Sequence, residues 1–348
     1  SSRSVQVFFV MLTKLYAHPK ACWKIRLSPA FPKPTLKKDG SSLYLRHFNR
    51  YRMKNISVVG AGTMGNGIAH VFAQYDHQVT LIDVSEAALE KALATISANL
   101  DRMVKKETIS TADKDRTLSN IRTASSLEEG LSIAHLVVEA ATENSALKLQ
   151  IFRDLDVFAP EKAILATNTS SISITRIAAA TKRPTQVIGM HFMNPVPVMK
   201  LVEVIRGFDT SDDTTRIIME LSQTLGKVPV EVNDYPGFVA KRILMPMINE
   251  AIYTLYEGVA GVTEIDTVMK LGMAHPMGPL QLADFIGLDV CLSILRVLQD
   301  GFGQPKYAPC PLLVNMVTAG KLGAKSGEGF YKYTPGSKEL IPAQNFTR

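Results

Sequence analysis

The stretch NISVVGAGTMGNGIAHVFAQY, residues 55–75, decides the fold of this chain. An apolar β-type run leads into a G-x-G-x-x-G turn, and the turn opens a run with the pattern of a helix. Gly60 permits the tight turn, Gly62 lets the backbone approach a pyrophosphate, and Gly65 lets helix and strand pack closely. The pyrophosphate would lie at the helix N-terminus, where unpaired N–H groups favour negative charge. The stretch therefore predicts a dinucleotide-binding turn.

A second apolar run, QVTLI, ends in Asp83, 23 residues after Gly60. This is close to the spacing at which a carboxylate binds the adenosine ribose hydroxyls of a dinucleotide. An acid at this place would repel a 2′-phosphate, so the sequence predicts NAD and not NADP as the cofactor. The alternative is a glycine-rich turn followed by an incidental aspartate.

Residues 53–233 alternate between strand and helix patterns, with Ser85 as the expected N-cap of a helix that runs to Glu107. Such alternation predicts an α/β domain with a parallel, doubly wound, Rossmann-type sheet, whose ligands bind at the carboxyl ends of the strands. Glu143 and Asn168 follow two of the strand runs, so both are candidate ligand contacts; otherwise they are a solvated loop residue and a turn former. The expected strands are NISVVG, QVTLID, HLVVEA, AILATN, QVIGMHF, LVEVIR and KVPVEV.

A histidine and a glutamate lie twelve residues apart in HFMNPVPVMKLVE, residues 191–203. Each belongs to a β-type run, and the prolines between them favour an extended loop. If the two runs are neighbouring strands, His191 and Glu203 can meet. Glu203 would then hold one ring nitrogen as a donor and leave the other free to take a proton from a substrate. The alternative is a core histidine beside a strand-end glutamate.

Long helical patterns follow residue 233, and a short GEGFYKY run is the only further β pattern. Residues 234–334 therefore predict an all-helical C-terminal domain that begins at Pro236, a good first-turn residue. Its methionine-rich apolar face suits both a core and a homodimer interface. Residues 335–348 are expected to form a frayed tail.

The positive charge of the chain is concentrated at its start. Residues 1–52 hold eleven Lys or Arg and one acid, which gives this segment a net charge of +10. The formal net charge of the whole chain is +7, so the remaining residues carry −3. The charge is therefore no argument for nucleic-acid binding. This basic leader is expected to be translated sequence upstream of a start at Met53, an organelle transit peptide, or a disordered arm.

Composition excludes several classes of protein. Hydrophobic content of 46% and charged content of 20% are typical of a globular enzyme. Three cysteines cannot form a disulfide framework, and neither they nor the scattered histidines have the spacing of a metal site. The longest apolar run near the N-terminus, VQVFFVML, is too short to span a bilayer. We expect no metal, no nucleic-acid partner and no membrane partner.

Residues 53–334 resemble the 3-hydroxyacyl-CoA dehydrogenases, in particular the short bacterial type that acts on 3-hydroxybutyryl-CoA. The resemblance implies an NAD-binding domain, a helical dimerisation domain, and oxidation of (S)-3-hydroxyacyl-CoA to 3-ketoacyl-CoA. It rests on VVGAGTMGNGIAH, VVEAATEN, ATNTSS, GMHFMNPVPVMKLVE, DYPGFVAKRIL, KLGMAHPMGPLQLADFIGLD and KSGEGFYKY, in that order.

The resemblance also assigns roles to single residues. His191 matches the catalytic histidine of the family, Glu203 the glutamate paired with it, and Ser170 the serine that binds the substrate oxygen. The positions that match cofactor contacts are Glu143, Lys148 and Asn168, together with Gly60, Gly62, Gly65 and Asp83.

One position departs from the family pattern. In PGFVAKR the family usually carries asparagine where this chain has Lys241, at a place that helps to position the substrate. Lysine cannot accept a hydrogen bond and brings a charge. The cation could polarise the thioester carbonyl, impair turnover, or point away from the site. We expect reduced activity with NAD binding intact.

Two other functions remain open from the sequence. One is a dehydrogenase of a hydroxy acid without CoA, and the other is a weakly active or non-catalytic NAD-binding protein, for which Lys241 is the argument. The expected location is the cytoplasm, or the mitochondrial matrix if the leader is a transit peptide.

Overall fold

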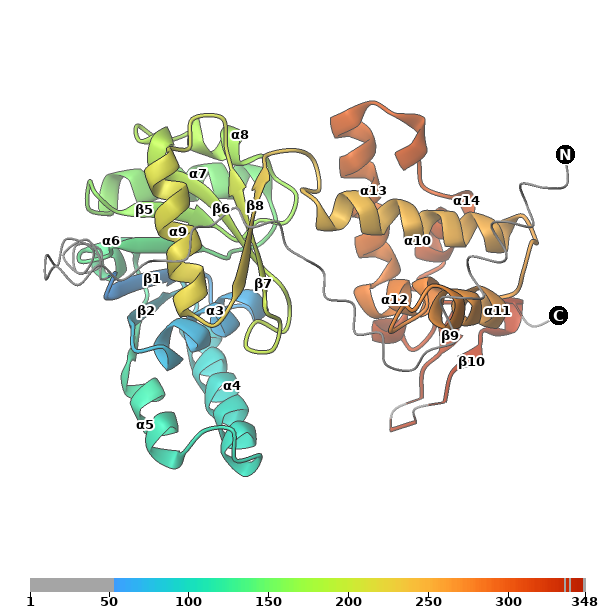
Figure 1. Cartoon of the computed structure of the whole chain (residues 1–348), viewed down its shortest axis with the longest axis horizontal. Helices are drawn as coiled ribbons and strands as arrows, with labels where there is room; N and C mark the ends of the chain where they lie inside the picture. The colour runs from blue at the N-terminus through green and yellow to red at the C-terminus, as the bar shows by residue number, and fades with distance from the viewer. Residues whose placement is uncertain (1–52, 335, 338, 347–348) are drawn as a thin grey trace, which may run out of the picture. The chain divides into compact units, whose positions relative to one another are not determined.

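The computed structural model describes residues 53–334, 336–337 and 339–346 (Figure 1). The leader expected at residues 1–52 lies outside these residues. Residues 55–233 form an α/β domain, and residues 240–318 form a helical domain with a core of its own. This is the predicted α/β domain followed by helices.

Eight strands form one sheet in the order β3-β2-β1-β4-β5-β6-β7-β8. Strands β1 to β6 are parallel, whereas β7 is antiparallel to β6 and β8 is parallel to β7. The doubly wound sheet is confirmed, but only its first six strands run in one direction. The strands are β1 (Asn55–Val59), β2 (Gln78–Ile82), β3 (Ile121–Ala124), β4 (Leu136–Glu139), β5 (Ile164–Thr167), β6 (Val187–Phe192), β7 (Leu201–Arg206) and β8 (Val228–Asn233).

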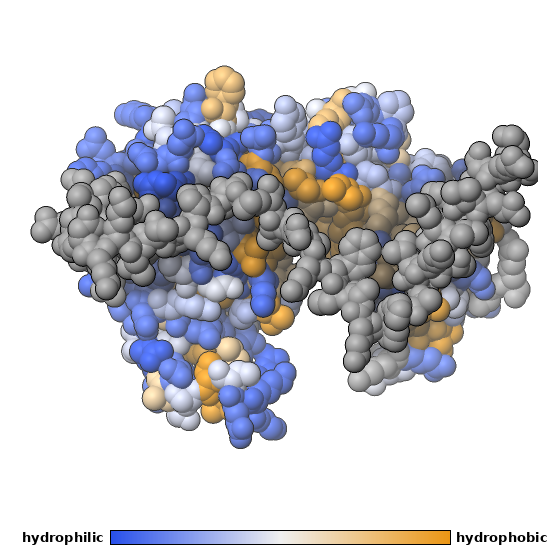
Figure 2. Space-filling view, in the orientation of Figure 1, coloured by the Kyte–Doolittle hydropathy of each residue, from blue (hydrophilic) through white to orange (hydrophobic). Residues whose placement is uncertain are grey.

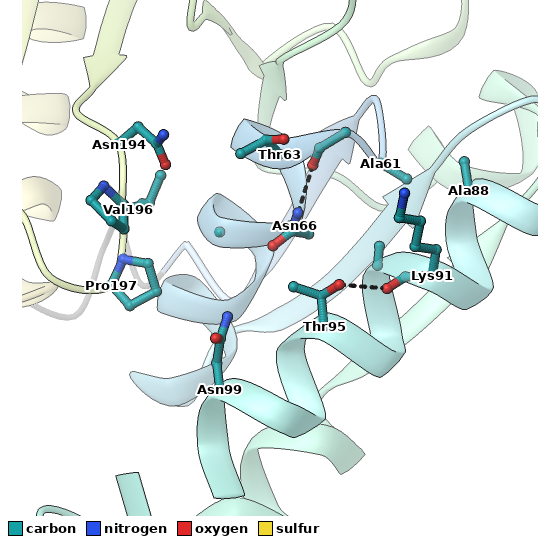
Figure 3. Close-up of a pocket in the computed structure, with 14 residues that line it drawn as sticks. Ala61, Thr63, Asn66, Ala88, Lys91, Thr95, Asn99, Asn194, Val196 and Pro197 are labelled. Atoms are coloured by element: carbon teal, nitrogen blue, oxygen red, sulfur yellow. Dashed lines mark hydrogen bonds between the residues drawn. The ribbon is translucent and has the colours of Figure 1, made fainter. Parts of the chain in front are cut away.

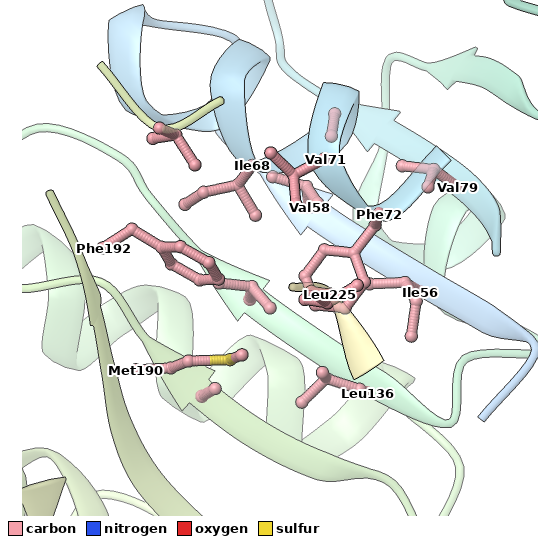
Figure 4. Packing of buried hydrophobic residues seen from close by; sticks show 14 of the residues in the cluster. Ile56, Val58, Ile68, Val71, Phe72, Val79, Leu136, Met190, Phe192 and Leu225 are labelled. Atoms are coloured by element: carbon pink, nitrogen blue, oxygen red, sulfur yellow. The ribbon is translucent and has the colours of Figure 1, made fainter. Parts of the chain in front are cut away.

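Helices cover both faces of this sheet because alternate strand residues point to opposite sides. Val58 belongs to the apolar cluster under α3, α4 and α9, in which Phe72 is fully buried (Figure 4). Val59, next in the chain, belongs to the cluster under α6, α7 and α8. These helices are α3 (Thr63–Gln74), α4 (Glu86–Lys105), α5 (Thr111–Ser119), α6 (Leu127–Leu131), α7 (Ser145–Phe158), α8 (Ile174–Ala178) and α9 (Asp212–Thr224), with a 3₁₀ turn, η1 (Pro184–Gln186).

Two local predictions in this domain have different outcomes. Ser85 caps α4 as expected, because its hydroxyl accepts a hydrogen bond from the Ala88 N–H at 3.2 Å. Strand β3 was not predicted. It has four residues and lies at the sheet edge, and its sequence, IRTA, has no apolar run.

The helical domain is confirmed, with two corrections at its helix boundaries. The first helix begins at Ala240 and not at Pro236, since Gly237 and Phe238 take positive φ angles of 74° and 50°. Gly287, at φ 99°, separates α12 from α13, where one continuous helical stretch was expected. The elements are α10 (Ala240–Tyr256), α11 (Val262–Thr267), a π-helical turn η2 (Val268–Gly272), α12 (Pro279–Ile286), α13 (Leu288–Phe302), η3 (Pro305–Tyr307), α14 (Pro311–Thr318) and η4 (Ala324–Ser326).

Part of the expected tail is ordered. Strand β10 (Ile341–Pro342) pairs with β9 (Tyr331–Lys332) in an antiparallel bridge, and a 3₁₀ turn, η5 (Gln344–Phe346), follows. Ala343 between them is fully buried. The described part of residues 335–348 thus packs onto the helical domain instead of fraying.

Candidate active site

The glycine turn between β1 and α3 has the geometry that a dinucleotide requires. Gly60 has φ 101°, and a Cβ there would lie 2.8 Å from the Ala140 carbonyl oxygen. At Gly65 a Cβ would lie only 1.7 Å from the Gly60 carbonyl oxygen, so the helix can approach the strand only with glycine at this position. At Gly62, the N-cap of α3, a Cβ would meet nothing within 4 Å. The turn is therefore tight on its inner side and open where a phosphate would approach the helix N-terminus.

Asp83 follows β2 directly and lies beside this turn. Its carboxylate accepts hydrogen bonds from the backbone N–H of Ala61 at 2.7 Å and of Ser85 at 3.0 Å. The first bond ties the carboxylate to the glycine turn, so the acid predicted to contact a ribose is fixed next to the predicted pyrophosphate site. A carboxylate can accept further bonds, which leaves capacity for ribose hydroxyls.

His191 and Glu203 meet across the hairpin formed by β6 and β7, where they are paired in register. The Nδ1 atom of His191 lies 2.8 Å from Oε2 of Glu203, and the residues are 7% and 3% exposed. We find no hydrogen bond to the other ring nitrogen, Nε2, within the described residues. The contact predicted from the sequence is present, and the ring is oriented by one nitrogen only.

The other oxygen of Glu203 is held by the start of α10. Oε1 accepts hydrogen bonds from the N–H groups of Val239 at 3.2 Å and Ala240 at 3.0 Å. Burial alone would raise the pKa of Glu203, but the hydrogen bonds and the attraction to His191 outweigh it and lower this pKa. Glu203 is thus an ionised carboxylate at neutral pH, as the partner of an imidazole base should be.

Glu143 lies at the centre of a second polar cluster, beyond the carboxyl end of β4. Its Oε1 atom accepts hydrogen bonds from the Ser170 N–H at 2.9 Å and from the hydroxyls of Thr169, Ser170 and Ser171 at 2.8, 3.0 and 2.9 Å. Partial burial opposes ionisation, but the Lys148 ammonium and these hydrogen bonds lower the pKa of Glu143. The carboxylate therefore fixes the loop that follows β5.

Lys241, in the first turn of α10, reaches this cluster. Its ammonium donates a hydrogen bond to Oγ of Ser170 at 2.6 Å. Burial lowers the pKa of Lys241, although Glu143 and Glu203 attract its positive charge and oppose the shift. The lysine does not point away, since it contacts the serine that was predicted to bind the substrate oxygen.

Lys148 and Asn168, both predicted as cofactor contacts, have partners inside the protein. Lys148 is 1% exposed, and its ammonium binds the Glu139 carboxylate at 2.5 Å and lies 3.6 Å from Glu143. Asn168 is buried at the end of β5, and its side-chain oxygen accepts a hydrogen bond from the Phe192 N–H at 2.9 Å. Both residues connect the strand ends around the site.

Sequence reasoning missed Glu139, the last residue of β4. This carboxylate is fully buried and also accepts hydrogen bonds from the Ala141 N–H and the Thr167 hydroxyl, each at 2.7 Å. An acid at the end of the apolar run LVVE, with Lys148 nine residues later, was the available signal.

A cavity of about 420 Å³ opens beside the first turn of α3. Figure 3 shows Lys91 and Thr95 of α4 on one side and the loop from β6 to β7, with Val196 and Pro197, on the other. None of the residues that line the cavity is acidic, and Lys91 contributes a positive charge. Asp83 is not among them, but Ala61, Gly62 and Thr63 of the glycine turn are, so one end of the cavity lies at the predicted pyrophosphate site.

Among residues 53–334, 336–337 and 339–346, no group of three His, Cys, Asp or Glu side chains is placed to hold a metal ion. Over the same ranges, no helix combines the length and the apolar character needed to cross a bilayer.

Known proteins resemble the chain in both domains. Residues 55–235 match the family model of the 3-hydroxyacyl-CoA dehydrogenase NAD-binding domain, and residues 237–333 match that of the C-terminal domain. A probable 3-hydroxybutyryl-CoA dehydrogenase of Bacillus subtilis is 54% identical over 281 residues, which are 81% of this chain and 98% of the relative. The mitochondrial hydroxyacyl-coenzyme A dehydrogenase of Homo sapiens is 43% identical and covers 81% of this chain and 91% of its own length.

The fold agrees with solved structures of the same family. The crystal structure of (S)-3-hydroxybutyryl-CoA dehydrogenase from Ralstonia eutropha matches with a TM-score of 0.79 at 51% identity, over 81% of this chain and 99% of that one. A matched family model in each domain, a glycine turn open to a phosphate, and identities above 50% lead to one conclusion. The chain belongs to the 3-hydroxyacyl-CoA dehydrogenase family.

Proposed function

We propose that the chain catalyses the reversible NAD-dependent oxidation of short-chain (S)-3-hydroxyacyl-CoA to 3-ketoacyl-CoA, with 3-hydroxybutyryl-CoA as the expected substrate. The observation that carries the proposal is the buried His191–Glu203 pair at 2.8 Å. The names of the relatives from Bacillus subtilis and Ralstonia eutropha support the choice of substrate.

In this reaction His191 acts as the general base. Its Nε2 atom takes the proton of the substrate hydroxyl, while Nδ1 keeps its hydrogen on Glu203. The negative charge of Glu203 stabilises the imidazolium that forms, and in the reverse direction the same ring returns the proton. NAD, when bound, supplies the chemistry of hydride acceptance. Ser170 is the predicted contact of the substrate oxygen, and its hydroxyl, which donates to Glu143 in the structure, would turn from Glu143 to donate to that oxygen.

The residues around the glycine turn fit NAD. The open side of Gly62 and the N-terminus of α3 would hold the pyrophosphate, and Asp83 would bind the ribose. Asn168, at a strand end, remains a predicted cofactor contact. Because Lys148 is buried on Glu139, we propose that it serves the cofactor site through its neighbour Glu143.

We assign the part of the cavity between α4 and the loop from β6 to β7 to the CoA part of the substrate, and its end at Gly62 to the cofactor pyrophosphate. The wall that contains Val196 belongs to the loop that follows His191, so a thioester that reaches His191 can extend along this loop. The absence of acidic side chains from the lining and the presence of Lys91 suit a ligand that carries phosphates.

The experiment that tests the proposal is the NADH-dependent reduction of acetoacetyl-CoA by the full chain, followed by NADH absorbance. We expect turnover with NADH and little with NADPH, since Asp83 would repel a 2′-phosphate. Free acetoacetate is the matched substrate control for the alternative of a dehydrogenase without CoA. Equal rates with acetoacetate and acetoacetyl-CoA would favour that alternative, and NADH binding without turnover would favour a non-catalytic protein.

The contact of Lys241 with Ser170 favours a second candidate, a weakly active member of the family. The Lys241 ammonium donates a hydrogen bond to the hydroxyl oxygen of Ser170. Its positive charge also disfavours the protonated, positively charged form of His191 that the reaction requires. We therefore expect Lys241→Asn to raise kcat/KM for acetoacetyl-CoA, by about tenfold for a gain of about 1.4 kcal/mol, with NADH affinity unchanged. Lys270→Asn, at an exposed lysine of the same domain, is the control. An unchanged rate in Lys241→Asn would show that the lysine does not limit turnover.

We further propose a homodimer formed through the helical domain, in the cytoplasm. The helical domain leaves large apolar side chains exposed, including Leu271 at 82% and also Ile243, Val259 and Met273. Figure 2 shows that apolar residues reach the surface on the face drawn. Light scattering of the purified chain gives the mass directly, and the mass of a single chain at micromolar concentration would contradict the dimer.

A further inference from the structure

The loop between β6 and β7 forms one wall of the cavity beside α3. Asn194, Pro195, Val196 and Pro197 all line the cavity (Figure 3). The loop makes one tight turn, in which the N–H groups of residues 198 and 199 both donate to the Pro195 carbonyl, at 3.0 and 2.9 Å. A loop with two prolines forms few ladder hydrogen bonds, so its position depends on contacts from elsewhere.

Lys227 supplies such a contact from the start of β8. It is 8% exposed, and its ammonium donates hydrogen bonds to the carbonyl oxygens of Val196 at 2.5 Å and Met199 at 2.8 Å. The Val196 carbonyl lies within the turn and the Met199 carbonyl at its end. The side chain therefore fixes the cavity wall from behind.

Among the described residues, this lysine has no carboxylate partner. No ion pair of Lys227 is found in the described part of the chain, and burial lowers the pKa of its ammonium. Nearby His70 is fully buried on α3, and burial together with the charge of Lys227 lowers the pKa of His70 to about 4. The histidine is thus neutral at neutral pH, and the ammonium carries the charge. A buried cation without a counterion costs free energy and adds positive potential to its surroundings.

We propose that Lys227 is a positioning residue for the CoA part of the substrate. It holds the loop that walls the cavity and adds positive potential behind a lining without acidic residues. This inference rests on the proposed function and deepens it. The residue does not contact the reacting atoms, so its loss should affect the recognition of the nucleotide portion and not the chemical step.

The test compares two thioesters in the full-length enzyme. Acetoacetyl-CoA carries the nucleotide portion, and S-acetoacetyl-N-acetylcysteamine lacks it. In Lys227→Met we expect the KM for acetoacetyl-CoA to rise about tenfold, the effect of losing one charge-assisted contact of about 1.4 kcal/mol. The KM for the truncated thioester, the kcat values and the NADH affinity should stay within about twofold, well below that tenfold step.

Lys200→Met is the matched control, because Lys200 belongs to the same loop and is exposed. An equal loss with both thioesters, a fall in kcat alone, or no change in any constant would overturn the inference. If Lys227→Met does not fold, the same KM values are measured for Lys227→Arg, which keeps the charge but changes its position. A rise for acetoacetyl-CoA alone then supports the inference, and unchanged values refute it. An inactive wild type would refute the proposed function, whereas an active wild type with an unaffected variant would refute only the role of Lys227.

Discussion

Glu203→Gln tests the central pair of the site most directly. The variant keeps the size of the side chain and removes its charge. With a charge separation of roughly 4 Å and an effective dielectric constant of about 20, the attraction between carboxylate and imidazolium is about 4 kcal/mol. A neutral amide recovers about 1 kcal/mol of this as a hydrogen bond. The remaining loss of about 3 kcal/mol corresponds to a fall in kcat of about a hundredfold.

Geometry adds to this loss. Glu203 accepts hydrogen bonds at both oxygens, from His191 at one and from Val239 and Ala240 at the other. Glutamine has one accepting oxygen, so its amide must face either the ring N–H or the start of α10. The estimate of a hundredfold is therefore a lower bound.

The assay is kcat for NAD-dependent oxidation of 3-hydroxybutyryl-CoA, the direction in which His191 gains the charge, with NADH affinity and the thermal midpoint measured in parallel. Glu231→Gln on β8 is the control, since that carboxylate is 45% exposed and pairs with Arg206 at 3.3 Å. We expect it to leave kcat unchanged. A value of kcat in Glu203→Gln within about threefold of the wild type, less than the 1.4 kcal/mol of a tenfold step, would refute the role of Glu203 as the counter-charge.

Three further predictions concern the cofactor side of the site. Gly62→Ala should fold normally and lose NADH affinity, whereas Gly65→Ala should destabilise the domain, because its Cβ would overlap the backbone of the turn. Denaturant unfolding measures the stability of each variant, and a fluorescence titration with NADH measures its affinity for the cofactor. Asp83→Asn should weaken NADH binding about tenfold, or about 1.4 kcal/mol, in the same titration, and an unchanged affinity would remove Asp83 from the ribose site. Lys148→Met should lower the free energy of unfolding by about 3 to 5 kcal/mol, because it leaves the Glu139 carboxylate buried without its partner; a loss below about 1 kcal/mol, the worth of an exposed pair, would contradict this.

The sequence predicted those features that depend on local pattern. The strand, glycine turn and helix of residues 55–75 follow from adjacent residue types, and the buried strands of the sheet are continuous apolar runs. The meeting of His191 and Glu203 also follows from local information. Two β-type runs joined by a short proline loop form a hairpin, and the register of the hairpin pairs these residues. Strand β3 shows the limit, because an edge strand of four residues needs its neighbour β2 more than its own composition.

Features that depend on distant partners were not predictable. The start of α10 was placed at Pro236 because proline is common in a first helical turn. In the structure the helix begins four residues later, and Glu203 accepts hydrogen bonds from the N–H groups of Val239 and Ala240. The N-terminus of a helix favours negative charge, so this carboxylate from β7 stabilises the start of a helix in the next domain. No local signal near residue 236 reports this acceptor.

The charges gathered at the site explain why one lysine matters for the proposed reaction. Three carboxylates and two ammonium groups are in contact or in electrostatic reach of one another: Glu139, Glu143, Glu203, Lys148 and Lys241. If all five groups are charged, their net charge is −1. A neutral His191 leaves this net charge at −1, and a protonated His191 brings it to zero. Asparagine in place of Lys241 would make these sums −2 and −1, a stronger bias toward the imidazolium. The buried pair of Glu139 and Lys148 contributes nothing to that balance, so if His191 is the base, Lys241 is the residue that we expect to disfavour its protonated form.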